Sequence, residues 1–188
     1  MATRDSEATR QRLIEAARRE FGEFGNAGAR VDRIAANAES NKAQIYHYFG
    51  SKDQLFDAVW ASVIKEFVVD TPVDIDDLPG YAVRLADVYA ANPEIQRLVT
   101  WKRLERGDDP PHAFAVESTP PIIDAIAKAQ ASGTVADHFD APVLFSLILS
   151  IAAMWQTHSP DFASIVGVSD PKRRREIVRD AVERLLVR

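Results

Sequence analysis

The side chains best suited to chemistry lie close together in the first third of the chain, and the chemistry that they suit is hydrogen bonding to nucleic acid. Lys42 can contact a phosphate or the edge of a guanine, Gln44 can pair bidentately with adenine, and His47 can donate to a phosphate oxygen. Tyr46 and Tyr48 add two phenolic donors nearby. The residue types therefore predict a surface that reads DNA.

Three candidate contacts also have a simpler explanation that does not involve DNA. Gln44 can complete a helix cap, and Tyr48 can be half-buried. Lys52 can contact a phosphate, or it can be a solvated residue in the first turn of a helix. The prediction of a DNA-reading surface therefore depends mainly on Lys42 and His47.

Two helices joined by a tight turn are needed to position these side chains. Asn41 can cap the first helix, and Gln44, three residues on, can reach back to it. Ser51 and Gln54 repeat the same spacing at the start of the next helix. Two helix starts therefore lie ten residues apart.

Apolar positions predict a buried side for the DNA-reading helix and a further helix upstream. Ile45 and Phe49 lie at i and i+4, so they can anchor the reading helix to a core. The upstream pattern, with a period of 3.6 residues, comprises Val31, Ile34, Ala35 and Ala38. With a turn at Glu39 and Ser40, this is the helix-turn-helix layout, whose second helix enters the major groove.

Beyond this layout, the stretch from Leu13 to Val59 resembles the TetR family of bacterial transcriptional repressors. The resemblance is carried by Phe21-Gly22-Glu23-Phe24-Gly25, by Ile34-Ala35, and by Ile45-Tyr46-His47-Tyr48-Phe49 followed by Gly50-Ser51-Lys52. It implies an all-α protein with an N-terminal three-helix helix-turn-helix DNA-binding head and a helical ligand-binding and dimerisation body. We place the head at residues 1–51 and the body at residues 52–188, with a connecting helix over about 52–68.

The resemblance also assigns the positions that face DNA. In this chain they are Arg30, Ser40, Asn41, Lys42, Ala43, Gln44, Tyr46, His47, Tyr48 and Lys52. Nearby, Glu39 and Ser40 replace the glycine and aliphatic residue that are common in the turn, and Ala29 replaces a hydroxyl residue. Ala43 replaces a glycine but can touch a thymine methyl, and Arg30 can supply a phosphate contact. These departures concern the operator and the binding strength more than the fold.

Charge is distributed unevenly along the 188 residues. The formal net charge is −5, yet residues 1–60 hold nine Lys or Arg and nine Asp or Glu, so the acidic excess lies in residues 61–188. A neutral head can bind phosphates where its cations are grouped, but few cations imply modest affinity and a shallow salt dependence per subunit. Useful affinity therefore requires two heads that act on one site.

Composition limits the class of protein. With 46% hydrophobic residues the chain can bury a sizeable core. It has no cysteine, which fits a reducing compartment, and no secretory leader pattern precedes the first helix. The longest apolar run, Ala141–Trp155, has 15 residues and contains two serines, so it is short for a membrane span. We expect a cytoplasmic protein without a membrane partner.

Apolar periodicity and breaker residues predict the remaining helices. The first runs from Ser6 to Phe24 and ends at Gly25. Its expected inward residues are Leu13, Ala17, Phe21 and Phe24. The helix that starts at Ser51 carries Leu55, Phe56, Val59, Ile64, Phe67 and Val68. After a loop over 69–80, helices are expected at 81–91, 94–106, 121–131, 141–157 and 170–187.

The last two of these helices are the expected dimer interface. Helix 141–157 is apolar on nearly every side and helix 170–187 carries an apolar stripe, so both need neighbours. In the TetR family such helices pair two subunits as a four-helix bundle, which implies a homodimer and a roughly palindromic operator. The alternative is that both helices only fill the core of a monomer.

By resemblance, the body should also hold a pocket for a small-molecule effector that releases DNA. The candidate lining residues are Tyr81, Tyr89, Leu98, Trp101, Leu104, Phe114, Ile122, Ile126, Phe145 and Trp155. Most of them are apolar, so we expect a small, largely apolar effector and no cofactor. Each residue alone can equally be part of the core.

Enzymatic function is not favoured by the sequence. Its four histidines are scattered, and it has no thiol, no glycine-rich phosphate loop and no nucleophile elbow. Asp137, His138 and Asp140 could approach one metal ion, but Asp140 is also well placed as a helix cap, and no metal site is predicted. An alternative function is that of a helical small-molecule-binding or scaffolding protein whose head no longer reads DNA, which Glu39, Ala29 and the neutral head motivate.

Overall fold

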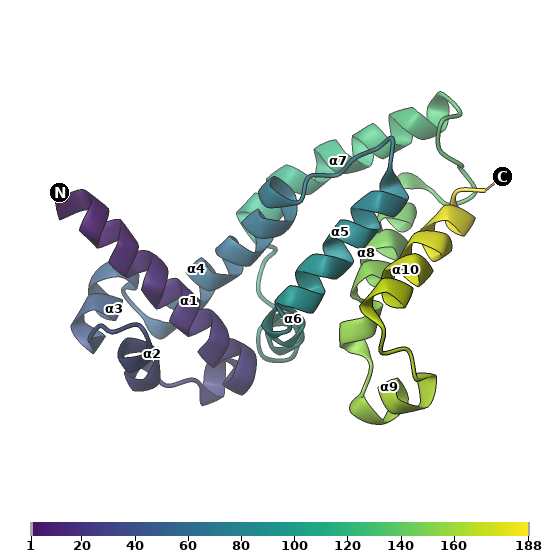
Figure 1. Ribbon diagram of the computed structural model, residues 1–188. Coiled ribbons are helices and arrows are strands. Elements are labelled where there is room, and N and C mark those ends of the chain that lie inside the picture. Colours follow the sequence, from purple (N-terminus) through teal and green to yellow (C-terminus); the bar gives the residue numbers. More distant parts are fainter. Residues whose placement is uncertain (1, 188) are drawn as a thin grey trace. The chain divides into compact units, whose positions relative to one another are not determined.

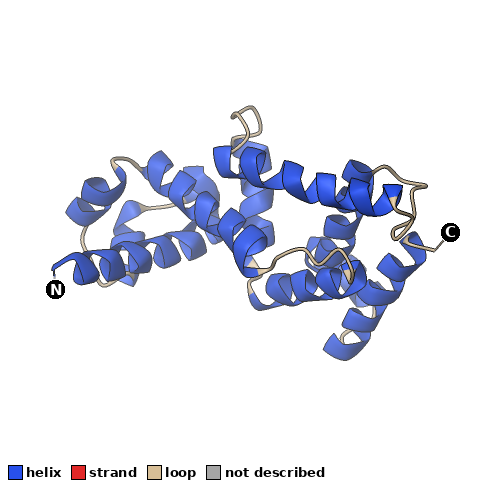
Figure 2. Ribbon diagram, turned by 90° about the horizontal axis from the view of Figure 1, so that it is seen from above, coloured by secondary structure: helices blue, strands red, loops and turns tan. Residues whose placement is uncertain are grey.

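The structure is a computed structural model that describes residues 2–187, with side chains from residue 5 onward. All regular structure in this part of the chain is helical and none of it is strand, as Figure 2 shows, so the predicted all-α fold is confirmed. By contacts the chain divides into two compact units. The N-terminal unit comprises Met1–Lys65 and Glu94–Pro110, and the C-terminal unit comprises Glu66–Pro93 and Pro111–Arg188.

The N-terminal unit is built around its first helix. Its described helices are α1 (Ala2–Gly28), α2 (Val31–Asn37), α3 (Lys42–Phe49), α4 (Lys52–Lys65) and α6 (Glu94–Glu105). Helices α2, α4 and α6 all pack against α1, while α3 contacts α2 and α4 (Figure 1). The rings of Phe21 and Phe56 meet edge to face in the core, with centroids 5.1 Å apart. Helix α1 therefore braces the helix-turn-helix pair, α2 and α3.

Helix α6 belongs to the N-terminal unit although the segments on both sides of it in sequence belong to the other unit. Our predicted boundary between head and body, after residue 51, lies directly behind the reading helix. It remains a prediction. By contacts, both α4 and α6 pack with the N-terminal helices.

Gly25 breaks α1 at the residue where the sequence predicts its end. Its φ is 69° and its ψ 179°, a conformation that is essentially restricted to glycine, and the chain then makes one more helical turn to Gly28. The last turn of α6 lies against this break. A Cβ at residue 25 would be 2.6 Å from Glu105 Oε1 and 2.9 Å from the ring of Trp101, so only glycine fits this close approach.

The inward side of α1 is mostly as predicted. Its buried residues include Leu13, Ala17 and Phe21. Phe24 was also predicted to be buried, and this was wrong, because its ring is 38% exposed. The reason is that a charged group rather than the core covers this end of α1: the Arg33 guanidinium lies 4.2 Å from the Phe24 ring centroid.

The connecting helix, predicted over about 52–68, is α-helical at first and then π-helical. Helix α4 stops at Lys65, and η1 (Glu66–Asp70) follows where the two units divide. Val63, which is not in the predicted apolar set, is buried because it lies four residues after the buried Val59 and shares its side of the helix, whereas Ile64 is half-buried.

The C-terminal unit contains a second group of helices. Within the described residues they are α5 (Leu78–Ala91), α7 (Ala113–Ala131), α8 (Ala141–Thr157), α9 (Pro160–Val166) and α10 (Pro171–Leu185). Helix α8 packs against α5, α7 and α10, and α5 also lies along α10 (Figure 1). No single helix among residues 2–187 is long and apolar enough to cross a membrane. Only α8 and α9 taken together reach that length and composition, and they are bent by 99°.

Two helix starts in the C-terminal unit differ from prediction because of local caps. Helix α5 begins at Leu78 because Asp77 Oδ1 accepts the Gly80 N–H at 2.8 Å and Pro79 fits the first turn. Helix α9 was not predicted, and Ser159 caps its start. The predicted cap of α8, Asp140, is confirmed, and in the structure Asp170 caps α10 in the same way.

Helix α7 begins earlier than predicted and continues through Pro120 and Pro121. The sequence places a helix start at Pro121, because proline lacks the N–H that a helix interior uses. The two prolines leave the carbonyls of Val116 and Glu117 without their helical donors. Both of these residues are exposed, so water can take the place of the missing donors.

Replacing Gly25 by Ala should destabilise the protein more than replacing Gly167, which also has a positive φ. At Gly167 the nearest atom to an added Cβ is 4.0 Å away, so we expect only backbone strain of about 1 kcal/mol. At Gly25 a clash with α6 adds to the strain, and we expect a loss of about 3 kcal/mol. Urea denaturation of both variants measures the difference. Equal losses would contradict the close contact with α6.

Candidate nucleic-acid interface

Helix α3 carries the predicted reading surface on a short, well-anchored element. Its cap forms as expected, because Asn41 Oδ1 accepts the Gln44 backbone N–H at 3.0 Å. Ile45 and Phe49 are buried on its inner side, so the opposite side faces outward. The exposed residues here are Asn41, Lys42, Ala43, Tyr46 and His47, and Ser40, in the turn before α3, is half-buried.

Gln44 and Tyr48 are both half-buried, but they are held differently. The cap bond of Gln44 is made by its backbone, so this bond leaves the side-chain amide available for a base edge. The Tyr48 hydroxyl forms a hydrogen bond with Ser6 Oγ of α1 at 3.0 Å. Its ring meets that of His47 edge to face, with centroids 5.3 Å apart. Tyr48 therefore links α1 to α3.

Lys42 forms an ion pair with Asp32 of α2, with 2.6 Å between Nζ and Oδ1. The hydrogen bond to Asp32 raises the pKa of Lys42, so the ammonium stays charged at neutral pH. Both side chains are more than half exposed, and exposed ion pairs contribute little because water screens them. A phosphate can therefore displace Asp32 from Lys42.

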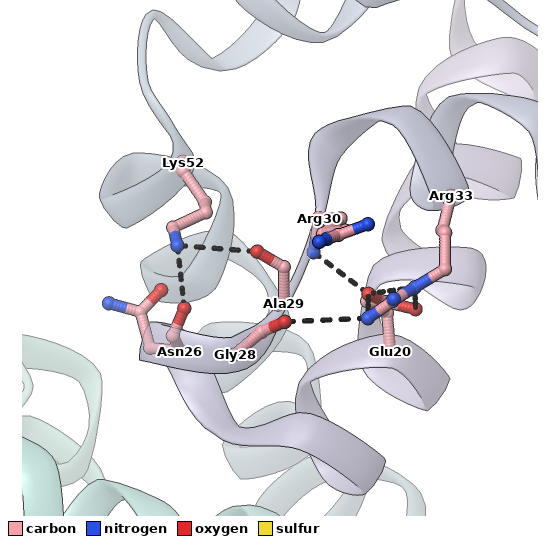
Figure 3. A network of polar contacts seen from close by, with 7 residues as sticks. All are labelled: Glu20, Asn26, Gly28, Ala29, Arg30, Arg33 and Lys52. Atoms are coloured by element: carbon pink, nitrogen blue, oxygen red, sulfur yellow. Dashed lines mark hydrogen bonds and ion pairs between the residues drawn. The ribbon is translucent and has the colours of Figure 1, made fainter.

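The Lys52 ammonium binds backbone carbonyls at the corner between α1 and α2 (Figure 3). Its Nζ donates to Asn26 O at 2.7 Å and to Ala29 O at 3.4 Å. The next residue, Asp53, accepts from the Asn26 side-chain amide at 2.7 Å. The first turn of α4 therefore holds the chain that leads into α2.

A buried carboxylate that was not among the predicted site residues organises the start of α2 (Figure 3). Glu20 of α1 is 4% exposed, and its Oε1 accepts the backbone N–H of Arg30 at 2.8 Å. The same oxygen lies 2.6 Å from Arg33 Nη2, which also donates to Gly28 O at 3.3 Å.

These contacts differ from the usual capping box in the origin of the acceptor. In that motif the third helical residue is Glu or Gln, and its side chain accepts the N–H of the cap residue. Here the third residue of α2 is Arg33, and the cap residue, Arg30, makes no side-chain cap bond. Glu20 binds both, so the acceptor for this helix start comes from α1.

The sequence contains a signal for Glu20. This residue lies three positions after Ala17 and seven after Leu13, so it shares the buried stripe of α1. Carboxylates are rarely buried without a partner. The position therefore predicts a cationic partner, but the spacing does not identify Arg33.

The turn between α2 and α3 has a common form with an uncommon residue. Helix α2 ends in a Schellman motif, in which the Ser40 N–H donates to Ala35 O at 2.9 Å. The Glu39 N–H donates to Ala36 O at 3.1 Å. The motif places Glu39 at φ 50°, in the left-handed region, whereas Gly133 takes the same place after α7. The turn therefore forms without glycine but at a cost in backbone strain.

The predicted effector-pocket residues are divided between the two units. Leu98, Trp101 and Leu104 belong to α6 in the N-terminal unit. The C-terminal unit contains Tyr81, Tyr89, Phe114, Ile122, Ile126, Phe145 and Trp155. The pocket therefore stays a prediction.

Within the C-terminal unit, three of these residues offer polar groups. Burial raises the pKa of Tyr89 to about 12 and also raises that of Tyr81, so both hydroxyls remain hydrogen-bond donors at neutral pH. The Trp155 Nε1 is buried without a hydrogen-bond partner among the described residues. The Arg174 guanidinium lies 5.3 Å from the centroid of the Trp155 ring.

No group of three or more His, Asp or Glu side chains that could hold a metal ion occurs in the described part of the chain. The stretch with Asp137 and His138 likewise forms no such group. Asp140 instead caps α8, where it accepts the Val143 N–H at 3.0 Å.

Two family models match the sequence and together cover most of it. Residues 13–59 match the bacterial regulatory proteins of the tetR family, and residues 77–184 match the tetracyclin repressor-like C-terminal domain. This chain belongs to the TetR family. It is therefore a transcriptional regulator with a helix-turn-helix DNA-binding segment, as the sequence predicts.

Individual TetR-family proteins resemble the chain over most of its length. It is 37% identical over 193 residues to the HTH-type transcriptional repressor SCO4008 of Streptomyces coelicolor, with 100% of both chains covered. It is 26% identical over 176 residues to the HTH-type transcriptional repressor NicS of Pseudomonas putida, covering 87% of this chain and 82% of that one. The crystal structure of the transcriptional regulator SCO4942 from Streptomyces coelicolor has a TM-score of 0.84 and 37% identity, with coverage of 96% of this chain and 99% of that one.

Replacing Glu20 by Gln should destabilise this TetR-family protein by lowering its Tm by about 4–8 °C. The change removes the charge that binds Arg33 and one of the acceptor oxygens, in a site too buried for water to compensate. Thermal unfolding followed by circular dichroism measures the shift. Glu23→Gln, at an exposed position on the same helix, is the control and should change the Tm little. Equal shifts in both variants would contradict the structural role of Glu20.

Replacing Glu39 by Gly should instead stabilise the protein by about 0.5–1 kcal/mol, because glycine adopts the left-handed conformation without strain. Glu39→Gln removes the charge but keeps the strain, so it should leave stability unchanged. Urea denaturation of both variants separates the two effects. A Gly variant that is no more stable than the Gln variant would show that the turn is not strained.

Proposed function

We propose that this TetR-family regulator is a repressor that binds a roughly palindromic operator as a homodimer and releases it when a small, largely apolar effector binds. The observation that carries the proposal is the outer side of α3, where Lys42 and His47 are exposed and Gln44 is partly so. The relatives SCO4008 and NicS, both named as repressors, support the direction of regulation.

A homodimer through helices α8 and α10 (predicted as 141–157 and 170–187) is supported by apolar side chains that one chain leaves partly uncovered. On one side of α8, Val143 is exposed, and the half-buried residues of that side are Leu147, Ile151 and Met154. Helix α10 buries Val178 and Val182, but the half-buried residues beside them are Ile177, Ala181 and Leu185. A second copy would cover both faces.

Charge also supports a dimer on DNA. Arg33 and Lys52 make contacts inside the N-terminal unit, so two cations of a head that is neutral overall are already engaged. Each head can therefore make few phosphate contacts. Two heads on one duplex gain affinity because the second binding step is intramolecular.

The effector is expected in the body of the protein. Of its candidate residues, Tyr81, Tyr89 and Trp155 supply polar groups, and the others in the C-terminal unit are apolar. An effector with a large apolar surface and one or two hydrogen-bonding groups fits this composition.

A second candidate function is that of a helical small-molecule-binding or scaffolding protein whose head does not read DNA. Asp32 beside Lys42 and Glu39 in the turn favour it, because carboxylates repel phosphates. The intact cap and anchors of α3 favour DNA binding instead.

Fluorescence anisotropy decides between the two functions. The purified protein is titrated against DNA from just upstream of its own gene, with a scrambled duplex as competitor and at two salt concentrations. Competitor-resistant binding at two subunits, or a multiple of two, per site supports the repressor. If that DNA binds no better than scrambled DNA, selection from random duplexes follows, and failure to select any duplex would refute specific DNA binding.

Replacing Lys42 by Ala should weaken binding to every duplex by about tenfold, because each subunit loses a phosphate or base-edge contact. For a dimer, the slope of log Kd against log salt should fall by about two. Gln44→Ala should instead relax preference at one base step, by about 1–3 kcal/mol. Lys128→Ala, at an exposed lysine of the C-terminal unit, is the matched control. If the Lys42 and Gln44 variants both bind as the parent does, α3 is not the reading helix.

A further inference from the structure

A carboxylate from α6 closes the break in α1. Glu105, the last residue of α6, accepts the Asn26 N–H through Oε2 at 2.7 Å. The Ala27 N–H lies 3.4 Å from Oε1 and 3.3 Å from Oε2 of the same carboxylate. These two N–H groups belong to the single helical turn that follows Gly25, which closes with a bond from the Ala29 N–H to Gly25 O at 3.2 Å.

This turn needs a cap from elsewhere. The first N–H groups of any helical segment have no partner within the segment, and a side chain at the preceding position normally accepts from them. The preceding residue here is Gly25, which has no side chain. Glu105 therefore supplies the missing cap from a helix about 80 residues further along the chain, and its charge strengthens both bonds.

The capped turn leads directly to residues that the DNA-reading unit uses. Its carbonyls at Asn26 and Ala29 accept from Lys52 of α4. Arg30 follows at once, with its N–H bound by Glu20. The corner is therefore held by charged side chains from α1, α4 and α6, and only Glu105 comes from outside residues 1–65.

A second contact joins the same end of α6 to α4. Arg106, directly after Glu105, donates from Nη1 to Asp57 Oδ1 at 2.8 Å, and its guanidinium lies 5.0 Å from the centroid of the Phe56 ring. The end of α6 thus contacts both helices that flank the helix-turn-helix pair. A shift of α6 would reach the reading unit through these residues.

We infer that Glu105 is a positioning residue for DNA binding: its carboxylate fixes the turn that follows Gly25 and thereby the start of α2 and the place of Arg30. The inference rests on the proposed function. In this inference Glu105 acts on affinity through the corner between α1 and α2, where its carboxylate is bound.

Glu105→Ala and Glu105→Gln test this inference. Glutamine keeps one acceptor oxygen but loses the charge, whereas alanine loses both. We expect the Kd for the operator to rise by about tenfold for Ala and by less for Gln. The control is Glu94→Gln at the other end of α6, where Glu94 pairs with Arg18 of α1 at 2.9 Å and does not touch the corner. Because this ion pair is largely buried, the variant should lose some stability, but it leaves the corner intact and should bind DNA within about twofold of the parent.

Amide hydrogen exchange measured by NMR supplies a readout that a general loss of stability would not reproduce. Exchange at Asn26 and Ala27 should accelerate in both Glu105 variants, while amides in the middle of α1 and α4 keep their protection. Unchanged exchange at these two amides would overturn the contact. Faster exchange with unchanged operator affinity would overturn the positioning role.

Failure of the proposed function gives a different result. In that case the parent protein itself binds no selected duplex, whatever residue occupies position 105. If the Ala variant does not fold, the Gln variant decides, because it keeps the size of the side chain.

Discussion

The corner between α1 and α2 depends on one constraint: backbone N–H and C=O groups that leave a helix must find other partners. Gly25 interrupts α1, and the residues up to Arg30 contain several such groups. Their partners are charged side chains: Glu20, Lys52 and Glu105. Since these come from three different helices, the bonds that satisfy the backbone also fix α2 relative to α1, α4 and α6.

The same constraint accounts for the limited positive charge of the reading surface. By sequence, Arg33 and Lys52 count among the cations of the head, and Lys52 is a candidate phosphate contact. In the structure Arg33 compensates a buried carboxylate, and Lys52 binds backbone carbonyls. Lys42 remains at the surface, but Asp32 lies beside it. Two of the cations of the head are therefore engaged within the protein, and the proposal of two heads on one operator takes this into account.

Helix caps formed by residues close together in sequence could be predicted. Contacts between residues far apart in sequence could not. Asn41 and Asp140 cap their helices as predicted, because each cap bond closes within three residues. The partner of Glu20 lies 13 residues away on another helix, and the partners of Glu105 lie 78 and 79 residues away. Spacing along the chain carries no information about such pairs until the helices are packed.

The position of α6 shows why local patterns are insufficient. Its length and apolar periodicity would be the same in either unit, and the family model for the C-terminal domain includes it. In the structure it packs on α1, where Ile95 and Leu98 are buried and Trp101 and Glu105 fit closely against Gly25. From sequence Gly25 only signals that a helix ends. In the structure it also makes a binding site for α6, because the break frees N–H groups for a carboxylate and the missing Cβ leaves room for that carboxylate to reach them.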